Sequence, residues 1–330
     1  PRWDAAEFER IKKSTINNIQ QREANPNAIA SVVLNKMLYG DDHVLSNPTV
    51  GYIETVASIT LEDVKAYYDK NFSPNITNYH VAGAVSQDGA MAALSELETK
   101  WASKEVEIPT YEVPAVPSEP QVYFVDVPNS KQSVIRIGRL TVAGDDPDYN
   151  LISIANERLG AGSSGQLFRI LREEKGFTYG ASSFVGRQAY DPGVWLAYSS
   201  VRSNVTKESL DIFKEVIGGY AEGYTQEDLE KTQNSLIKEN TRQYETLFSL
   251  IGILQSISTY DLPLDYIDQQ QQAVTNMTVD KVKEIVNQYM DLNNQIYLIV
   301  GDKATQFDRL KVNGPGNPIL VDKYGDPVAL

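Results

Sequence analysis

The sequence predicts an α+β fold made of two similar domains in tandem, each a mostly antiparallel sheet with helices on one face. Three observations lead to this prediction. Residues 59–83 align without a gap on residues 277–301, which indicates an internal repeat. Strand-like segments between 121 and 201 follow one another in pairs, separately from the helical segments, which is typical of α+β proteins. A proline-rich segment, 108–120, divides the two parts of the chain.

The two copies of the repeat differ in what precedes them. The second copy follows the strand-rich segment 121–223, whereas the first follows only helical sequence. A unit without its opening half cannot complete its own sheet. We therefore expect the first domain to be truncated, and the chain to be the C-terminal part of a longer protein. The expected divisions are the second half of a first domain (1–107), a linker (108–120) and a complete second domain (121–330).

The first part of the chain is expected to form several helices, then one strand and a further helix. Apolar residues recur at helical spacing from Phe8 to Ile19 and again from Ile29 to Met37. Thr60 is placed to cap a further helix, because acidic residues follow it in the first turn. Residues 78–85 are expected to form a strand, and 91–101 a helix.

The second part alternates strand pairs with helices. Strands are expected at 121–127 and 133–140, joined as a hairpin at Pro128, and at 178–186 and 194–201. Helices are expected at 147–159, at 166–175, from Ser203 and from Thr225, where Thr225 and Asp228 form a capping signature.

Composition excludes several kinds of function. The net charge of −14 argues against nucleic acid as a partner, since phosphate binding requires clustered lysine and arginine. The absence of cysteine excludes disulfides, thiolate zinc sites and cysteine nucleophiles. No apolar run approaches the ~20 residues that a membrane-spanning helix needs.

The sequence contains one possible nucleotide-binding motif and two histidines that could bind zinc, and neither feature indicates a functional site. Gly160, Gly162 and Gly165 match the GxGxxG dinucleotide fingerprint, but a helical segment precedes them where the fingerprint requires a strand, which favours a helix–helix turn. The two histidines, His43 and His80, stand in neither HExxH nor HxxEH, so the sequence predicts no hydrolytic zinc site in this chain.

Arg172 and Tyr179 form the most specific candidate site. The helix before them is expected to end at Gly176, which can adopt positive φ, and a strand is expected to begin near Tyr179. The two side chains would then point into one cleft, where a permanently charged guanidinium and a neutral hydroxyl suit a peptide carbonyl or a developing oxyanion. The alternative is a surface ion pair beside a packed tyrosine.

This stretch resembles the insulinase/pitrilysin family of zinc peptidases, which includes mitochondrial processing peptidase and the respiratory core proteins. The resemblance rests on the segments LGAGSSGQLF (159–168), REEKGFTY (172–179), FER (8–10), LYG (38–40), PTVG (48–51), VGD (300–302) and DKYGDP (322–327).

The resemblance implies a two-unit peptidase. One unit of such enzymes carries HxxEH and a later glutamate ligand of zinc, and the partner unit supplies an Arg–Tyr pair that holds substrate. Asn17 or Asn18 stands where that glutamate is expected, and an amide is a poor zinc ligand. The resemblance thus implies a non-catalytic unit that holds no cofactor of its own, with zinc in the partner half.

We therefore expect a chain that is inactive alone and binds peptide for an HxxEH-bearing half, fused or separate, in the periplasm or outside the cell. Arg172 and Tyr179 would be its substrate-binding residues. A homodimer is compatible with this arrangement. The alternatives are a structural or assembly subunit, like the respiratory core proteins, and a nucleotide-binding protein that uses Gly160–Gly165.

Overall fold

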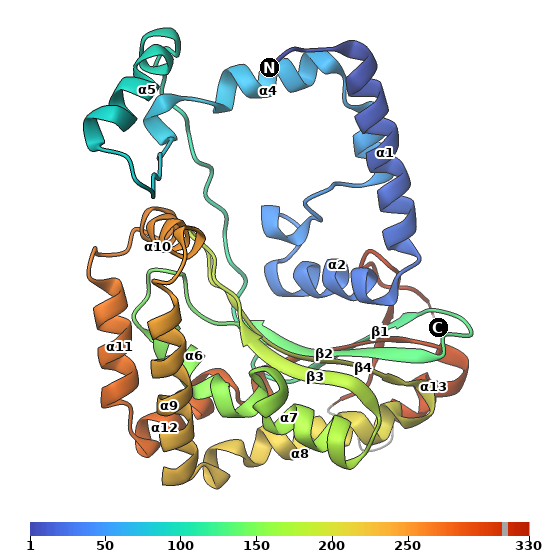
Figure 1. Cartoon of the computed structure of the whole chain (residues 1–330). Helices are drawn as coiled ribbons and strands as arrows, with labels where there is room; N and C mark the ends of the chain where they lie inside the picture. Colours follow the sequence, from blue (N-terminus) through green and yellow to red (C-terminus); the bar gives the residue numbers. More distant parts are fainter. Residues whose placement is uncertain (312–315, 330) are drawn as a thin grey trace. The chain divides into compact units, whose positions relative to one another are not determined.

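One mixed sheet forms the core of the second part of the chain. The computed structural model describes residues 1–311 and 316–329, and its six strands lie in the order β3-β4-β2-β5-β1-β6 (Figure 1). The first four of these pair antiparallel, whereas β1 runs parallel to both β5 and β6. The sheet is thus more mixed than expected. The strands are β1 (Gln121–Asp126), β2 (Gln132–Leu140), β3 (Thr178–Val185), β4 (Val194–Arg202), β5 (Ile296–Gly301) and β6 (Ile319–Val321).

The helices account for most of the remaining chain. They are α1 (Ala5–Glu23), α2 (Pro26–Tyr39), α3 (Ile53–Ser58), α4 (Leu61–Asn71), α5 (Gln87–Lys100), α6 (Asp148–Gly160), α7 (Gln166–Phe168), α8 (Thr206–Gly223), α9 (Gln226–Arg242), α10 (Leu247–Thr259), α11 (Tyr266–Asn276), α12 (Val279–Tyr289) and α13 (Lys303–Lys311). None of the helices described is long and apolar enough to cross a membrane.

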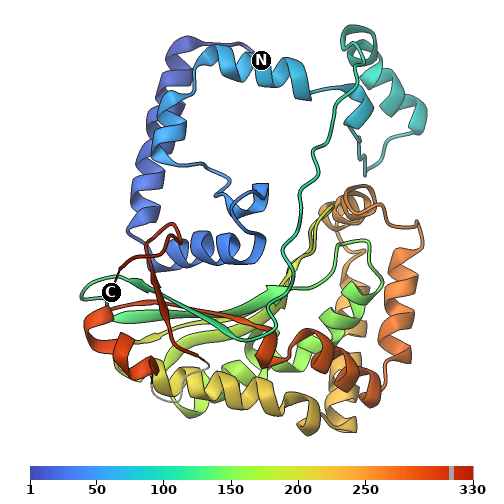
Figure 2. The same cartoon turned by 180° about the vertical axis from the view of Figure 1, so that it is seen from behind.

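Both faces of the sheet are covered, which corrects the expectation of helices on one face only. Helices α6, α7, α8 and α12 lie on one face, and α2 lies on the other (Figures 1 and 2). Strand β5 shows why: all of its residues are buried, with Tyr297 and Ile299 on the α6 side and Leu298 and Val300 on the α2 side. Since β5 is apolar on both faces, each face needs a helical layer.

Contacts along the chain group it into two compact units. One contains 1–21, 49–110 and 238–266, and the other contains 22–48, 111–237 and 267–330, including the whole sheet and α2. This grouping does not test the expected division at 107 and 121, which stays a prediction.

The internal repeat is a repeat of helices. The series α1 to α4 returns as α9 to α12, and α4 and α12 have the same length. Thr60 and Thr278 are the N-cap residues of α4 and α12. Their side-chain hydroxyls accept hydrogen bonds from the N3 amides, those of Asp63 (3.1 Å) and Lys281 (3.2 Å). A single turn of 3₁₀-helix then follows each helix at matching positions, Pro74–Ile76 and Leu292–Asn294.

The repeat ends where the sheet begins. The second copy continues into β5, but residues 78–85 of the first copy form no strand, so that expectation was wrong. The reason is a lack of partners: β5 pairs with β1 and β2, whereas no described strand lies beside 78–85. Tyr79 and Val81 are consequently half exposed.

The expected hairpin between β1 and β2 was also wrong. Strand β5 lies between them, with Tyr297 paired to Val122 on one side and to Ile137 on the other. The segment around Pro128 therefore connects strands that are second neighbours. The other expected pair, β3 and β4, is a true antiparallel hairpin.

Candidate functional site

A widened helical turn places Arg172. The helix expected at 166–175 begins as α7 but continues from Arg169 to Glu174 as a π-helix. The amide of Lys175 accordingly bonds to the carbonyl of Ile170, five residues back, at 3.0 Å. Leu167 and Leu171 are fully buried on its inner side, which leaves Arg172 exposed. Single π-turns of this kind occur often at functional sites.

Gly176 ends this helix as expected. Its φ is +63°, a conformation that favours glycine, and its amide bonds to the carbonyl of Arg172 at 3.2 Å. The amide of Phe177 bonds to the carbonyl of Leu171 at 2.9 Å, so the chain reverses within two residues and enters β3.

A β-bulge places Tyr179. In the pairing of β3 with β4, Thr178 lies opposite Val201 and Ala181 lies opposite Ser199, so Tyr179 and Gly180 together face Ser200. The extra residue lets Thr178 and Ala181 both turn toward the core while Tyr179 points outward. Bulges are common beside active sites because they redirect a side chain in this way.

Two buried hydroxyls hold the bulge. The Thr178 hydroxyl accepts from the Gly180 amide at 3.1 Å and donates to the carbonyl of Ser200 at 2.7 Å. The Ser199 hydroxyl donates to the Gly180 carbonyl at 2.8 Å. Backbone groups that the bulge removes from the strand ladder are therefore still hydrogen-bonded.

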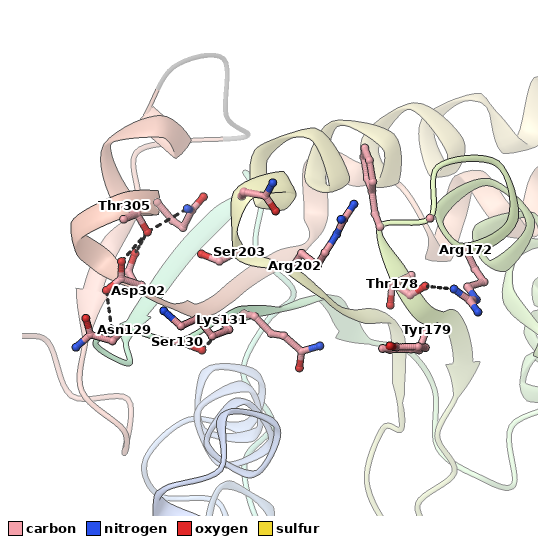
Figure 3. Close-up of a pocket in the computed structure, with 15 residues that line it drawn as sticks. Asn129, Ser130, Lys131, Arg172, Thr178, Tyr179, Arg202, Ser203, Asp302 and Thr305 are labelled. Carbon is pink, nitrogen blue, oxygen red and sulfur yellow. Dashed lines mark hydrogen bonds between the residues drawn. The ribbon is translucent and has the colours of Figure 1, made fainter.

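Arg172 and Tyr179 lie together in space. The guanidinium carbon of Arg172 is 5.3 Å from the centre of the Tyr179 ring, within cation–π range, and one of its nitrogens donates to the Thr178 carbonyl at 3.5 Å (Figure 3). The Tyr179 side chain is 84% exposed. Among the described residues no carboxylate pairs with Arg172, so the alternative of a surface Arg–Glu pair does not apply.

Both side chains line one open groove of about 990 Å³. The groove runs along the start of β3, the end of β4 and the loop before β2, to the start of α13. Figure 3 shows Arg172 and Tyr179 apart from Asn129, Asp302 and Thr305, with Lys131 and Arg202 between them.

Positive charge predominates in this groove. Lys131, Arg172 and Arg202 line it, and Asp302 is the one carboxylate among the described lining residues. Asp302 accepts hydrogen bonds from the Thr305 hydroxyl at 2.6 Å and the Asn129 amide at 2.9 Å, which lower the pKa of its carboxyl and keep it ionised.

The glycines of the GxGxxG motif pack rather than bind. Gly160 ends α6 against β3, where a Cβ would stand 2.1 Å from the hydroxyl oxygen of Ser183. A Cβ on Gly165 would stand 2.7 Å from the Cα of Gly160, and Gly162 has a φ of +61°. The segment is a turn between helical segments, as expected, and each glycine has a steric reason.

The two histidines have structural partners. The ring of His43 is buried; its Nδ1 accepts from the Leu45 amide at 3.1 Å, so its Nε2 carries the proton and donates to Asp191 at 3.1 Å. Burial, followed by the Asp191 charge, raises the pKa of the neighbouring Tyr39 to about 12. His80 bonds to the Ser258 hydroxyl at 2.8 Å. In the part of the chain described, no three His, Asp or Glu side chains cluster as metal ligands.

Comparison with known proteins identifies the family. The profile of the peptidase M16 inactive domain matches residues 58–236, more than half of the chain. The chain belongs to the M16 (insulinase/pitrilysin) family. The match includes the groove residues Arg172 and Tyr179, and it agrees with the resemblance seen in the sequence.

The curated M16 relatives are distant and longer. "Non-peptidase homolog YmxG" of Helicobacter pylori is 21% identical over 92% of this chain and 69% of its own length. "Uncharacterized zinc protease YmxG" of Bacillus subtilis is 24% identical over 71% of this chain and 56% of its own length. The chain thus spans between about half and 70% of these relatives.

A solved M16 structure has the same fold. The peptidase M16 inactive domain from Pseudomonas fluorescens superposes with a TM-score of 0.82 at 26% identity, covering 92% of this chain and 72% of the other. A protease from Helicobacter pylori gives 0.80 at 16% identity, covering 90% and 72%, which shows the fold alone.

The sequence did not predict several residues that line or support the groove. Lys131 directly precedes β2 and Arg202 ends β4, and the antiparallel pairing, with Gln132 opposite Arg202, brings them to the same end of the β2–β4 pair. Their only local signal was a basic residue at a strand terminus, which is common on any surface. Thr178 and Ser199 act through a bulge, for which the sequence has no marker.

Proposed function

We propose that this chain is the non-catalytic, substrate-binding part of an M16 zinc endopeptidase. Arg172 and Tyr179 would orient a peptide for an HxxEH-bearing catalytic half, which would supply the zinc and the activated water. One observation carries this proposal: an exposed guanidinium and an exposed tyrosine, 5.3 Å apart, are held at the wall of a groove by a π-turn and a bulge. Both π-turns and β-bulges recur at functional sites.

Binding of peptides to the purified chain tests this proposal. We expect a set of labelled, unstructured peptides to bind with measurable fluorescence anisotropy, and Arg172→Ala to weaken binding about 10-fold, which corresponds to the loss of about 1.4 kcal/mol. Arg169→Ala, in the same helical segment but outside the groove, is the matched control. If no peptide binds, or if Arg172→Ala binds as wild type does, the proposal fails.

A structural or assembly role is the second candidate. Phe248 and Leu264 are 89% and 88% exposed, and α10 has no buried residue although its sequence is apolar. Surfaces of this kind usually contact a partner. Such contact is compatible with either role, but a scaffold has no use for the Arg172–Tyr179 arrangement.

We further infer that the helices α1, α3 and α4 belong to a second α+β domain, whose sheet would include residues 78–85 with strands from a partner segment. The helix series repeats with matching caps, yet 78–85 has no strand beside it among the residues described. An extended apolar segment without a paired neighbour readily accepts a strand from a partner.

Hydrogen exchange tests this arrangement. In the chain alone, the amides of 79–85 should exchange rapidly, while the equivalent amides of β5, 297–301, should be strongly protected. Addition of the catalytic half should slow exchange in 79–85 and leave β5 unchanged. Unchanged, rapid exchange in 79–85 within a stable complex would refute the second sheet.

A further inference from the structure

The groove that contains Arg172 and Tyr179 is positively charged in a strongly acidic protein. Three cations line it, against a single described carboxylate, although the chain as a whole has a net charge of −14. We propose that the groove selects peptide segments that carry aspartate or glutamate, with Lys131 and Arg202 as the residues that determine this specificity. The proposal rests on the peptide-binding function inferred above.

Lys131 and Arg202 have charges available for a ligand. Neither side chain forms an ion pair within the described ranges, and both are exposed. They differ in this from Arg309, which forms an ion pair with Glu208 at 2.8 Å. An unpaired cation in a concave surface interacts more strongly with an incoming anion than one on a convex surface.

The strand pairing fixes the two cations relative to each other. Arg202 lies opposite Gln132, the neighbour of Lys131, and the amide of Ser203 bonds to the carbonyl of Lys131 at 3.0 Å. Backbone on both sides is therefore held rigidly, and only the side chains need to be ordered by a ligand. Pre-ordered backbone reduces the entropic cost of binding.

Asp302 offsets these cations only in part. Hydrogen bonds from Thr305 and Asn129, followed by the charge of Lys131, lower the pKa of its carboxyl, but it forms no ion pair with either cation within the described ranges. Its carboxylate is occupied by the Thr305 hydroxyl and the Asn129 amide, which hold it at the far end of the groove from Arg172. A peptide carboxylate between these ends would meet Lys131 and Arg202, while a neighbouring peptide carbonyl could accept from Arg172. The neutral lining groups, such as Ser130, Ser203 and Asn204, offer hydrogen bonds and no repulsion.

The acidic surface elsewhere does not cancel this selectivity. A surface charge is screened beyond about 8–10 Å at physiological ionic strength, so the groove cations act on a bound peptide more than the distant carboxylates do. Tyr179 is the one exposed aromatic ring described at the groove, which is a poor platform for stacked nucleobases.

Matched peptides provide the test. Three labelled peptides share one sequence except at a few positions occupied by glutamate, glutamine or lysine. At about 0.1 M salt we expect the glutamate peptide to bind about 10-fold more tightly than the glutamine peptide, and the lysine peptide to bind least tightly. The advantage of glutamate should shrink several-fold when salt is raised to about 1 M.

Variants assign the selectivity to the two cations. Lys131→Gln with Arg202→Gln should bring the glutamate-to-glutamine affinity ratio close to 1, while Lys131→Arg with Arg202→Lys should restore it. Lys13→Gln, which removes an exposed charge from α1, should leave the ratio as in wild type. Circular dichroism of the double variants confirms that the fold is retained.

The outcomes separate this inference from the function on which it rests. Equal affinities of the three peptides for wild type, with binding still weakened by Arg172→Ala, would overturn the charge selectivity alone. Failure of every peptide to bind would overturn both. A single-stranded oligonucleotide that binds as tightly as the glutamate peptide would show a general anion site and would also overturn the inference.

Discussion

Tyr179→Phe and Arg172→Ala are each expected to lower peptide turnover about 10²–10³-fold when the chain is assembled with an HxxEH-bearing half. Loss of one preorganised donor to a developing oxyanion typically has this effect. Tyr179→Phe keeps the ring that contacts Arg172 at 5.3 Å and removes only the hydroxyl, so it isolates the hydrogen bond from the packing. The measurement is kcat/KM for one peptide, with thermal unfolding to confirm that stability changes by about 1 kcal/mol or less.

Two neighbours serve as matched controls for this experiment. Arg169 lies on the same helical segment as Arg172 and pairs with Glu174, and Tyr190 is 73% exposed outside the groove. Arg169→Ala and Tyr190→Phe should leave kcat/KM within about 3-fold of wild type, as is usual for surface changes. The double variant of Arg172 and Tyr179 should lose less than the product of the single losses, because the two groups act on one oxygen. Wild-type turnover in both single variants would make the pair structural and favour the scaffold role.

Gly160→Ala is expected to destabilise the fold by about 3 kcal/mol, the upper range for overpacking a rigid core. A Cβ at this position would stand 2.1 Å from the Ser183 hydroxyl oxygen and 2.2 Å from its amide nitrogen, so backbone and not only a side chain must move. Ser183 also donates to the buried amide oxygen of Asn156 at 2.6 Å, which accepts from Trp195 at 2.9 Å. Moving β3 away from α6 would break this network.

Chemical unfolding measures the effect of Gly160→Ala, and Gly219→Ala is the control. Gly219 is exposed within α8, and a Cβ there would meet nothing within 4 Å. Alanine at that site should stabilise the protein by about 0.5–1 kcal/mol, the usual gain for a helical glycine. A Gly160→Ala variant as stable as wild type would mean that α6 and β3 are not packed as described, and would reopen a ligand-binding role for this loop.

Local chemistry allowed much of the fold to be predicted from the sequence. The helix caps at Thr60 and Thr225 and the stop at Gly176 each depend on a few adjacent residues, and all three are confirmed. The β3–β4 hairpin was likewise predictable, because the turn residues Asp191, Pro192 and Gly193 separate two strand-like segments that follow each other in the chain. The order of strands that are distant in the sequence could not be predicted in this way. That β5 enters between β1 and β2 depends on burial of all its residues, which no local pattern near Pro128 records.

The candidate site was predictable in identity but not in geometry. Arg172 and Tyr179 stood out by residue type and spacing, whereas Lys131 and Arg202 are brought to them only by strand register. The strand expected at 78–85 fails for the opposite reason. Its residue pattern is compatible with a strand, but pairing requires neighbours that the described chain does not place there.

The π-turn before Gly176 and the bulge after it each accommodate one residue more than a regular helix or strand would. Chain length on either side of Gly176 therefore matters as much as residue identity. Shortening the helical side by one residue would turn the Arg172 side chain about 100° around the helix axis, since an α-helix has 3.6 residues per turn. Shortening the strand side would send the Tyr179 side chain to the opposite face of the sheet. A homologous protein could thus retain both residue types and lose the pair through a single deletion, so alignment gaps in this segment are a better guide to function than matching letters.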